Sequence, residues 1–166
     1  MRLLGRLVVV AIVAVWGLAT LPAHADSEHR QDARGDAPPV IDVRGVEYSH
    51  GTRLVRARAH VPGLGRRGSA SISISRFAIF EAGYVLQIKK RLGMPARLRF
   101  GFFNHFDLEP RQCSGASARW GDRGISLSVP RSCLEGHRTH RLFVQFGLQR
   151  GRDIDRAPAV RRLRMD

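Results

Sequence analysis

The sequence predicts an all-β protein, a single antiparallel β-sandwich of about seven to eight strands with one disulfide. Three observations predict this fold class. Apolar and polar side chains alternate with a period of two over most of the chain, turn-forming residues separate these stretches, and no helical spacing continues beyond two turns. With 166 residues, an apolar fraction of 43% and 25% charged residues, the chain fits one globular domain rather than a collagen-like repeat or a multi-span membrane protein.

Residues 1–25 have the three parts of a secretory signal peptide. Arg2 and Arg6 provide a charged head, residues 7–19 form an unbroken non-polar run, and small residues precede the expected cleavage point after Ala25. A retained membrane anchor is the alternative, but the run is shorter than the ~18–20 residues that span a bilayer. We therefore expect a secreted, extracellular protein with no transmembrane span after cleavage.

The mature chain is expected to have three parts. Residues 26–39 are predicted to be a disordered leader, because they contain four acidic residues, few apolar ones and two adjacent prolines. The β-sandwich domain is expected to occupy residues 40–150. Residues 151–166 contain five arginines and one proline, and we expect them to form a basic C-terminal tail that packs partly along one sheet edge.

The alternating stretches define the strands of this domain. The first begins at Ile41 and changes phase at Gly45, which predicts a bulge there, and the second ends at Val61 before a Gly-rich basic loop. In each strand the apolar set of alternate side chains is expected to face the core. The expected strands lie within residues 41–48, 55–61, 70–80, 84–89, 98–102, 117–120, 125–129 and 142–148.

Cys113 and Cys133 are the only cysteines, and export would place both in an oxidising compartment where a disulfide persists. The bond would span twenty residues of sequence, and closing a loop of that size stabilises a fold by about 3 kcal/mol on the chain-entropy argument. A redox-active pair is usually more closely spaced, and two thiols are too few for a Cys-rich zinc site. We therefore predict a structural disulfide.

Three features of the sequence are shared with a known group of proteins. An Arg/Val-alternating hairpin follows an acidic leader, residues 129–134 close a disulfide, and residues 153–158 precede a basic end. From Ile41 to the carboxyl end, the chain resembles small secreted, Arg-rich, uncharacterised β-sandwich proteins of high-GC Gram-positive bacteria. The resemblance implies a secreted β-sandwich with no established activity, and no functional residue can be transferred from it.

The basic residues are the most unusual feature of the composition. The chain has 28 Lys and Arg against 14 Asp and Glu, a formal charge of +14. Arg56 and Arg58 share the outward face of one expected strand, and Arg97 and Arg99 share that of another. If the two strands were neighbours, the four guanidinium groups would form a ladder suited to bind phosphate or carboxylate. The alternative is a solvated basic face that reflects codon usage alone.

Two stretches that contain acidic residues are candidate metal sites. His105, Asp107 and Glu109 would lie on one face if they were in a strand, with His137 and His140 as further nitrogen ligands, but nothing in the sequence brings these two groups together. A calcium site at Asp153 and Asp155 would have only two visible ligands, and Ca²⁺ takes ~6–8 oxygens. We therefore predict no metal and no cofactor.

The sequence also contains no catalytic motif such as Gly-x-Ser-x-Gly. We expect a non-enzymatic secreted protein that adheres to anionic cell-envelope polymer through an Arg-rich sheet face. No specific nucleic-acid partner is expected, because export separates the protein from nucleic acid. The alternative is a small-ligand or carbohydrate-binding module that uses loop aromatics such as Trp120 and Phe103. A hydrolase built from loop residues is a third, less favoured hypothesis, and the oligomeric state stays open.

Overall fold

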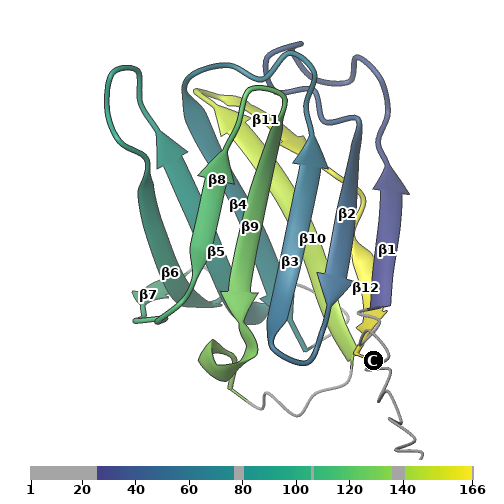
Figure 1. Ribbon diagram of the computed structural model, residues 1–166, viewed down its shortest axis with the longest axis vertical. Helices are drawn as coiled ribbons and strands as arrows, with labels where there is room; N and C mark the ends of the chain where they lie inside the picture. The colour runs from purple at the N-terminus through teal and green to yellow at the C-terminus, as the bar shows by residue number, and fades with distance from the viewer. Residues whose placement is uncertain (1–25, 77–80, 106, 136–140, 166) are drawn as a thin grey trace, which may run out of the picture.

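The computed structural model describes residues 26–76, 81–105, 107–135 and 141–165, and these residues form two antiparallel sheets that pack face to face (Figure 1). The all-β fold class is confirmed, but the described residues form twelve strands and one 3-10 turn, η1 (Arg131–Cys133), rather than seven to eight strands. The eight expected strands are all present, and four short peripheral strands extend the two sheets.

The first sheet has five strands in the order β1-β2-β3-β9-β8. All neighbouring strands in it are antiparallel, and β3 pairs with β9 residue for residue, from Leu54 opposite Pro130 to His60 opposite Gly124. The strand bounds are β1 (Asp26–Gln31), β2 (Gly45–His50), β3 (Leu54–His60), β8 (Ser117–Trp120) and β9 (Gly124–Pro130).

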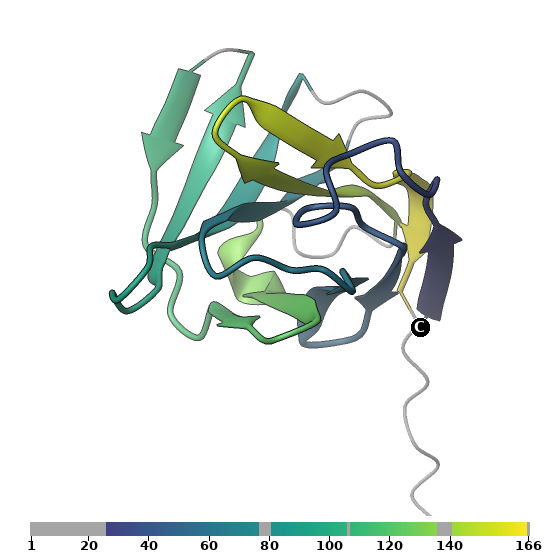
Figure 2. The same cartoon turned by 90° about the horizontal axis from the view of Figure 1, so that it is seen from above.

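The second sheet has the order β11-β10-β4-β5-β6-β7, and β12 also pairs with β10. β12 and β11 share one edge of β10, with β12 beside its first residues and β11 beside its last. β12 also lies beside β1 of the first sheet, so it closes this side of the sandwich (Figure 2). The strand bounds are β4 (Gly68–Ser75), β5 (Ala82–Lys90), β6 (Arg97–Asn104), β7 (Asp107–Pro110), β10 (Arg141–Arg150), β11 (Asp153–Arg156) and β12 (Val160–Arg164).

The core lies between the two sheets and consists of the alternate apolar side chains that the sequence pattern predicts. Burying a Leu, Ile or Val side chain contributes about 1.5–3 kcal/mol each, so this apolar layer holds the sheets together. The largest fully buried side chains of the core include Tyr48, Phe146, Ile72, Ile74, Leu86, Ile88, Ile125, Leu127, Leu148 and Leu163.

Tyr48 also joins the sheets through its hydroxyl group. Its Oη accepts a hydrogen bond from the backbone N–H of Phe146 at 2.9 Å and donates one to the carbonyl oxygen of Pro158 at 3.4 Å. Phe146 lies on β10 between the residues that pair with β12 and those that pair with β11. The Tyr48 hydroxyl therefore takes the place of a strand partner at the gap between the two short strands.

The prediction that residues 26–39 form a disordered leader is wrong, because part of this segment is a strand. Residues 26–31 form strand β1, which pairs with β2 from Asp26 opposite His50 to Gln31 opposite Gly45. A polar segment can form an edge strand because pairing needs only its backbone groups, and one face of an edge strand can stay in water. The predicted bulge at Gly45 is also wrong, because β2 begins at Gly45 and pairs with β3 in a continuous register.

The predicted basic tail is likewise part of the fold. Residues 153–156 and 160–164 form β11 and β12 on the open edge of β10. Val160 and Leu163 are buried, at 1% and 0% exposure, so the tail contributes apolar side chains to the core. The folded unit therefore extends on both sides of the expected residues 40–150.

The predicted disulfide is confirmed. Cys113 and Cys133 are joined, with their Cα atoms 5.4 Å apart. Cys113 precedes β8, and Cys133 lies in η1 directly after β9, so the bond closes the base of the β8–β9 hairpin. Strand β8 of this hairpin is the last strand of the five-stranded sheet, so β9 is its one strand neighbour.

Candidate functional site

The two predicted arginine pairs lie on different sheets. Arg56 and Arg58 are exposed on β3 of the five-stranded sheet, whereas Arg97 and Arg99 are exposed on β6 of the seven-stranded sheet. The ladder that depended on β3 and β6 being neighbours is therefore not formed. Arg58 lies 3.8 Å from a carboxylate oxygen of Glu47 on β2, so the first pair is partly neutralised by its own sheet.

The second arginine pair belongs to a larger basic surface. In the β5–β6 register, Arg97 lies opposite Lys89 and Arg99 lies opposite Gln87. Arg97, Arg99, Lys89 and Arg91 line a small depression together with two apolar residues of the hairpin tip. Sheet pairing thus brings cations from two strands onto one face.

Beside this depression lies a hollow of ≈ 930 Å³, which we name the basic hollow. Its polar floor comes from adjoining strands, since Gln149 pairs with Ser69 and Ser69 pairs with Lys89. Its cations come from three strand ends, the start of β4, the end of β5 and the end of β10. The charged side chains that line it are Arg67, Lys89, Lys90, Arg91, Arg150 and a single carboxylate, Asp153.

None of the five cations of the basic hollow forms an ion pair with a carboxylate in the part of the chain that the structure describes. Like charges that face one another across strands cost stability unless an anion compensates them. The surface is therefore suited to bind a ligand that carries several phosphate or carboxylate groups.

Sequence reasoning missed most of the basic hollow. Lys89, Lys90 and Arg91 are consecutive, so the sequence shows a local charge cluster there. It lies at the end of the expected strand 84–89 and before the next one, 98–102. Arg67 belongs to the Gly-rich basic loop seen in the sequence, but nothing in the sequence placed it or Arg150 beside Lys89, because their approach depends on the pairing of β4 with both β5 and β10.

A second hollow, of ≈ 720 Å³, is lined by residues of β5, β6 and β7 and of the segment before β8. Its apolar lining includes Leu98, Phe100 and Leu108. Arg99 and Arg111 also line it. The hollow exists because β6 and β7 extend beyond β8, the last strand of the shorter sheet (Figure 1).

The aromatic residues predicted for carbohydrate binding lie elsewhere. Trp120 is half-buried against the core, and its Nε1–H donates a hydrogen bond to the carbonyl oxygen of Gly65 at 3.0 Å. Phe103 lies on β6 opposite Gly83 of β5. Neither residue lines the two hollows described above.

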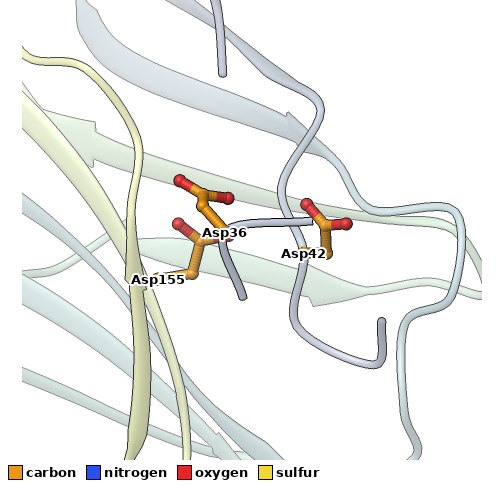
Figure 3. Close-up of side chains that lie close together, drawn as sticks. All are labelled: Asp36, Asp42 and Asp155. Atoms are coloured by element: carbon orange, nitrogen blue, oxygen red, sulfur yellow. The ribbon is translucent and has the colours of Figure 1, made fainter. Parts of the chain in front are cut away.

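A group of aspartates joins the N-terminal loop to β11 (Figure 3). Asp36 and Asp42 come from the loop between β1 and β2, and Asp155 comes from β11; one carboxylate oxygen of each lies within 4.8 Å of the others. The backbone N–H of Val43 donates to Oδ2 of Asp155 at 2.8 Å, and that of Gly35 donates to Oδ2 of Asp42 at 3.1 Å.

The pKa values of two aspartates are raised here: Asp155 of the cluster and Asp32, which interacts with Asp155. Burial, together with the charges of Asp155 and Asp36, raises the pKa of Asp32 to about 6, although the backbone N–H of Ala33 lowers it. Burial also raises the pKa of Asp155, and the neighbouring Asp36 and Asp42 add to this increase. Burial, more than the neighbouring charges, therefore disfavours the ionised forms of Asp32 and Asp155.

Asp36, Asp42 and Asp155 are, among the described residues, the one group close enough to share a metal ion. Arg44 already supplies part of the counter-charge, because its Nη2 lies 2.9 Å from Oδ2 of Asp42. These contacts support a structural role, in which the cluster fixes the N-terminal loop against β11.

The other metal candidates from the sequence are not brought together. His105 lies in the turn after β6 with a positive φ of 54°, whereas Asp107 and Glu109 lie in β7, so the three residues do not share one strand. Glu109 is paired with Arg111 at 2.7 Å. Asp153 stands at the basic hollow, away from the group that contains Asp155. His137 and His140 lie outside the described residues.

Comparison with known proteins gave no match: no protein family matches the chain, and no curated protein or solved structure is significantly similar to it. The resemblance to small secreted Arg-rich proteins therefore stays a prediction. The described residues include no helix long and apolar enough to cross a bilayer.

Proposed function

We propose that this protein is an exported, non-enzymatic adhesion protein that binds anionic material of the cell envelope, in particular anionic polymer, through the basic hollow. One observation carries the proposal. Five cations and one carboxylate surround the same hollow, and Arg97 and Arg99 continue the positive surface beside it. Export rests on the signal-peptide pattern of residues 1–25.

The chemistry of the hollow favours a polymeric anion over a single small one. Its volume of ≈ 930 Å³ is larger than one phosphate requires, and its cations come from separate strand ends. Arginine forms bidentate hydrogen bonds with phosphate or carboxylate, and serine and glutamine on the floor can donate further hydrogen bonds. A chain of regularly spaced anionic groups would contact several of these side chains at once.

The test compares two double variants with the same loss of charge. Arg67→Gln/Arg150→Gln removes cations from the basic hollow, and Arg56→Gln/Arg58→Gln removes two exposed cations from the other sheet. Binding to immobilised inorganic polyphosphate is measured at increasing salt. We expect the first variant to lose at least about tenfold in affinity, since hydrogen bonds to charged groups contribute about 1.5–3 kcal/mol each.

The control variant is expected to bind polyphosphate like the wild type. Binding of the wild type should weaken steeply as salt increases, because the Debye length falls from ~10 Å at 0.1 M to ~3 Å at 1 M. Equal loss of affinity in both variants would show that net charge alone, not the hollow, retains the protein.

The apolar hollow supports the alternative, a small-ligand module. Leu98, Phe100 and Leu108 line a space of ≈ 720 Å³, within the usual range of ligand pockets. Binding of an uncharged dye such as Nile red at this hollow would hardly change with salt. A Phe100→Ala variant that loses dye binding but retains polyphosphate binding would support this second activity.

A further inference from the structure

The hairpin between β5 and β6 exposes apolar side chains at its tip. Five large apolar side chains are exposed among the described residues, and three of them, Leu92 at 69%, Met94 at 51% and Leu98 at 40%, belong to this hairpin. Residues 91–99 are exposed throughout. Single exposed apolar residues are ordinary, but a group of them on a projecting element marks an interaction surface.

The tip is a defined turn that extends away from both sheets, as the two views show (Figures 1 and 2). The backbone N–H of Met94 donates to the carbonyl oxygen of Arg91, and Nζ of Lys90 donates to the carbonyl oxygen of Met94 at 3.1 Å. Gly93 has a φ of 71°, a conformation that most other residues adopt only with strain. The turn therefore presents Leu92 and Met94 at the end of the hairpin.

Cationic residues flank this apolar tip on both strands of the hairpin. Lys89, Lys90 and Arg91 precede it and Arg97 and Arg99 follow it, whereas the sequence has no acidic residue between Glu81 and Asp107. Met94 and Arg97 are three residues apart, at most about 10 Å along an extended strand. Side chains that enter a membrane interface reach about 5–10 Å below the headgroups, so the cations would lie at headgroup level.

We propose that the β5–β6 hairpin docks on an anionic phospholipid bilayer, with Leu92 and Met94 entering the interface and Lys89, Arg91, Arg97 and Arg99 contacting the headgroup phosphates. This inference rests on the proposed function, from which it takes the positively charged surface. It adds the phospholipid bilayer as an anionic partner of the cell envelope. A soluble polyanion would bind the cations but would leave the apolar side chains of the tip in water. An anionic bilayer would bind the cations through its headgroups and bury the apolar side chains. Arg67 and Arg150 of the basic hollow lie behind the hairpin and add to the attraction.

The experiment uses the protein exported by an expression host from its own full-length gene, so that any processing of residues 1–25 is the same in every variant. The test variant is Leu92→Ser/Met94→Ser. The matched control is Ile154→Ser, compared with the single variant Leu92→Ser as well; Ile154 is another exposed apolar side chain, on β11, and it lines neither hollow. Co-sedimentation is measured with vesicles of phosphatidylglycerol and phosphatidylcholine, and binding to inorganic polyphosphate is measured in parallel.

We expect the wild type and the control to sediment with the anionic vesicles and not with pure phosphatidylcholine vesicles. The hairpin variant should bind anionic vesicles about tenfold more weakly, because membrane affinity scales with buried apolar area. Leu92 lines the basic hollow and Met94 lines the depression beside it, but neither side chain carries a charge, so polyphosphate binding should change far less than vesicle binding. Retained polyphosphate binding also shows that the variant is folded. A Leu92→Trp variant should show a blue-shifted emission with anionic vesicles.

Two results would overturn this inference. Equal vesicle binding by the wild type and the hairpin variant would show that the tip does not enter the interface, and retained polyphosphate binding would then leave the proposed function standing. If the wild type binds neither vesicles nor polyphosphate at low salt, the proposed function fails and the inference fails with it.

Discussion

Replacing Tyr48 by Phe should weaken the contact between the two sheets more than its small change in size implies. The substitution keeps the buried ring and removes only the hydroxyl group. That group accepts from the N–H of Phe146 and donates to the carbonyl oxygen of Pro158. Phe146 pairs with Ile72 of β4 on one edge of β10, but on the other edge it has no strand partner, because it lies between the β12 and β11 pairings.

The magnitude follows from what each partner loses. Pro158 is exposed, so water can replace the long hydrogen bond to its carbonyl oxygen. Phe146 is 0% exposed, so its N–H would stay unsatisfied, which costs about 1–3 kcal/mol. We expect the free energy of unfolding to fall by about 2 kcal/mol, or the melting temperature by about 4–8 °C for a domain of this size.

The assay is urea unfolding followed by circular dichroism, with Tyr84→Phe as the matched control. Tyr84 is also buried, but the hydrogen bonds of its hydroxyl are with Glu135, an exposed residue whose backbone N–H donates to it at 2.9 Å. We expect the control to lose well under about 1 kcal/mol, because water can satisfy that N–H. A loss from Tyr48→Phe that does not exceed the control would refute the role assigned to the Tyr48 hydroxyl.

Four further predictions concern charge and covalent linkage. Burial raises the pKa of both tyrosines, so the stability they provide is present below about pH 10 and is lost as the pH rises further; absorbance at 295 nm should show tyrosinate only as the protein unfolds. Asp36→Asn should raise the melting temperature because it relieves repulsion in the aspartate cluster, and a decrease would indicate that the carboxylates share a cation. Asp42→Ala should lower stability by about 2–4 kcal/mol in urea unfolding, since it leaves Arg44 and the N–H of Gly35 without their acceptor; no change would contradict a structural role for the cluster. Cys113→Ala/Cys133→Ala should cost about 3 kcal/mol in the same measurement, and equal stability would mean that the β8–β9 hairpin needs no crosslink.

The positions of the eight central strands follow from the sequence alone. Along β3, β4, β9 and β10, every second side chain is apolar and buried, and the strand period of two makes this pattern readable without tertiary contacts. The Cys113–Cys133 pairing was also predictable, because the chain offers no other partner for either thiol.

The peripheral strands and the candidate site were decided only by the tertiary structure. β1 and β11 have largely polar sequences, and they form because β2 and β10 leave backbone N–H and C=O groups open at their edges. The apolar pattern shows which face of a strand is buried, but strand order depends on how distant segments pair. For this reason Arg97 and Arg99 face the same surface as Arg67 and Arg150, whereas Arg56 and Arg58, with the same local pattern, lie on the opposite sheet.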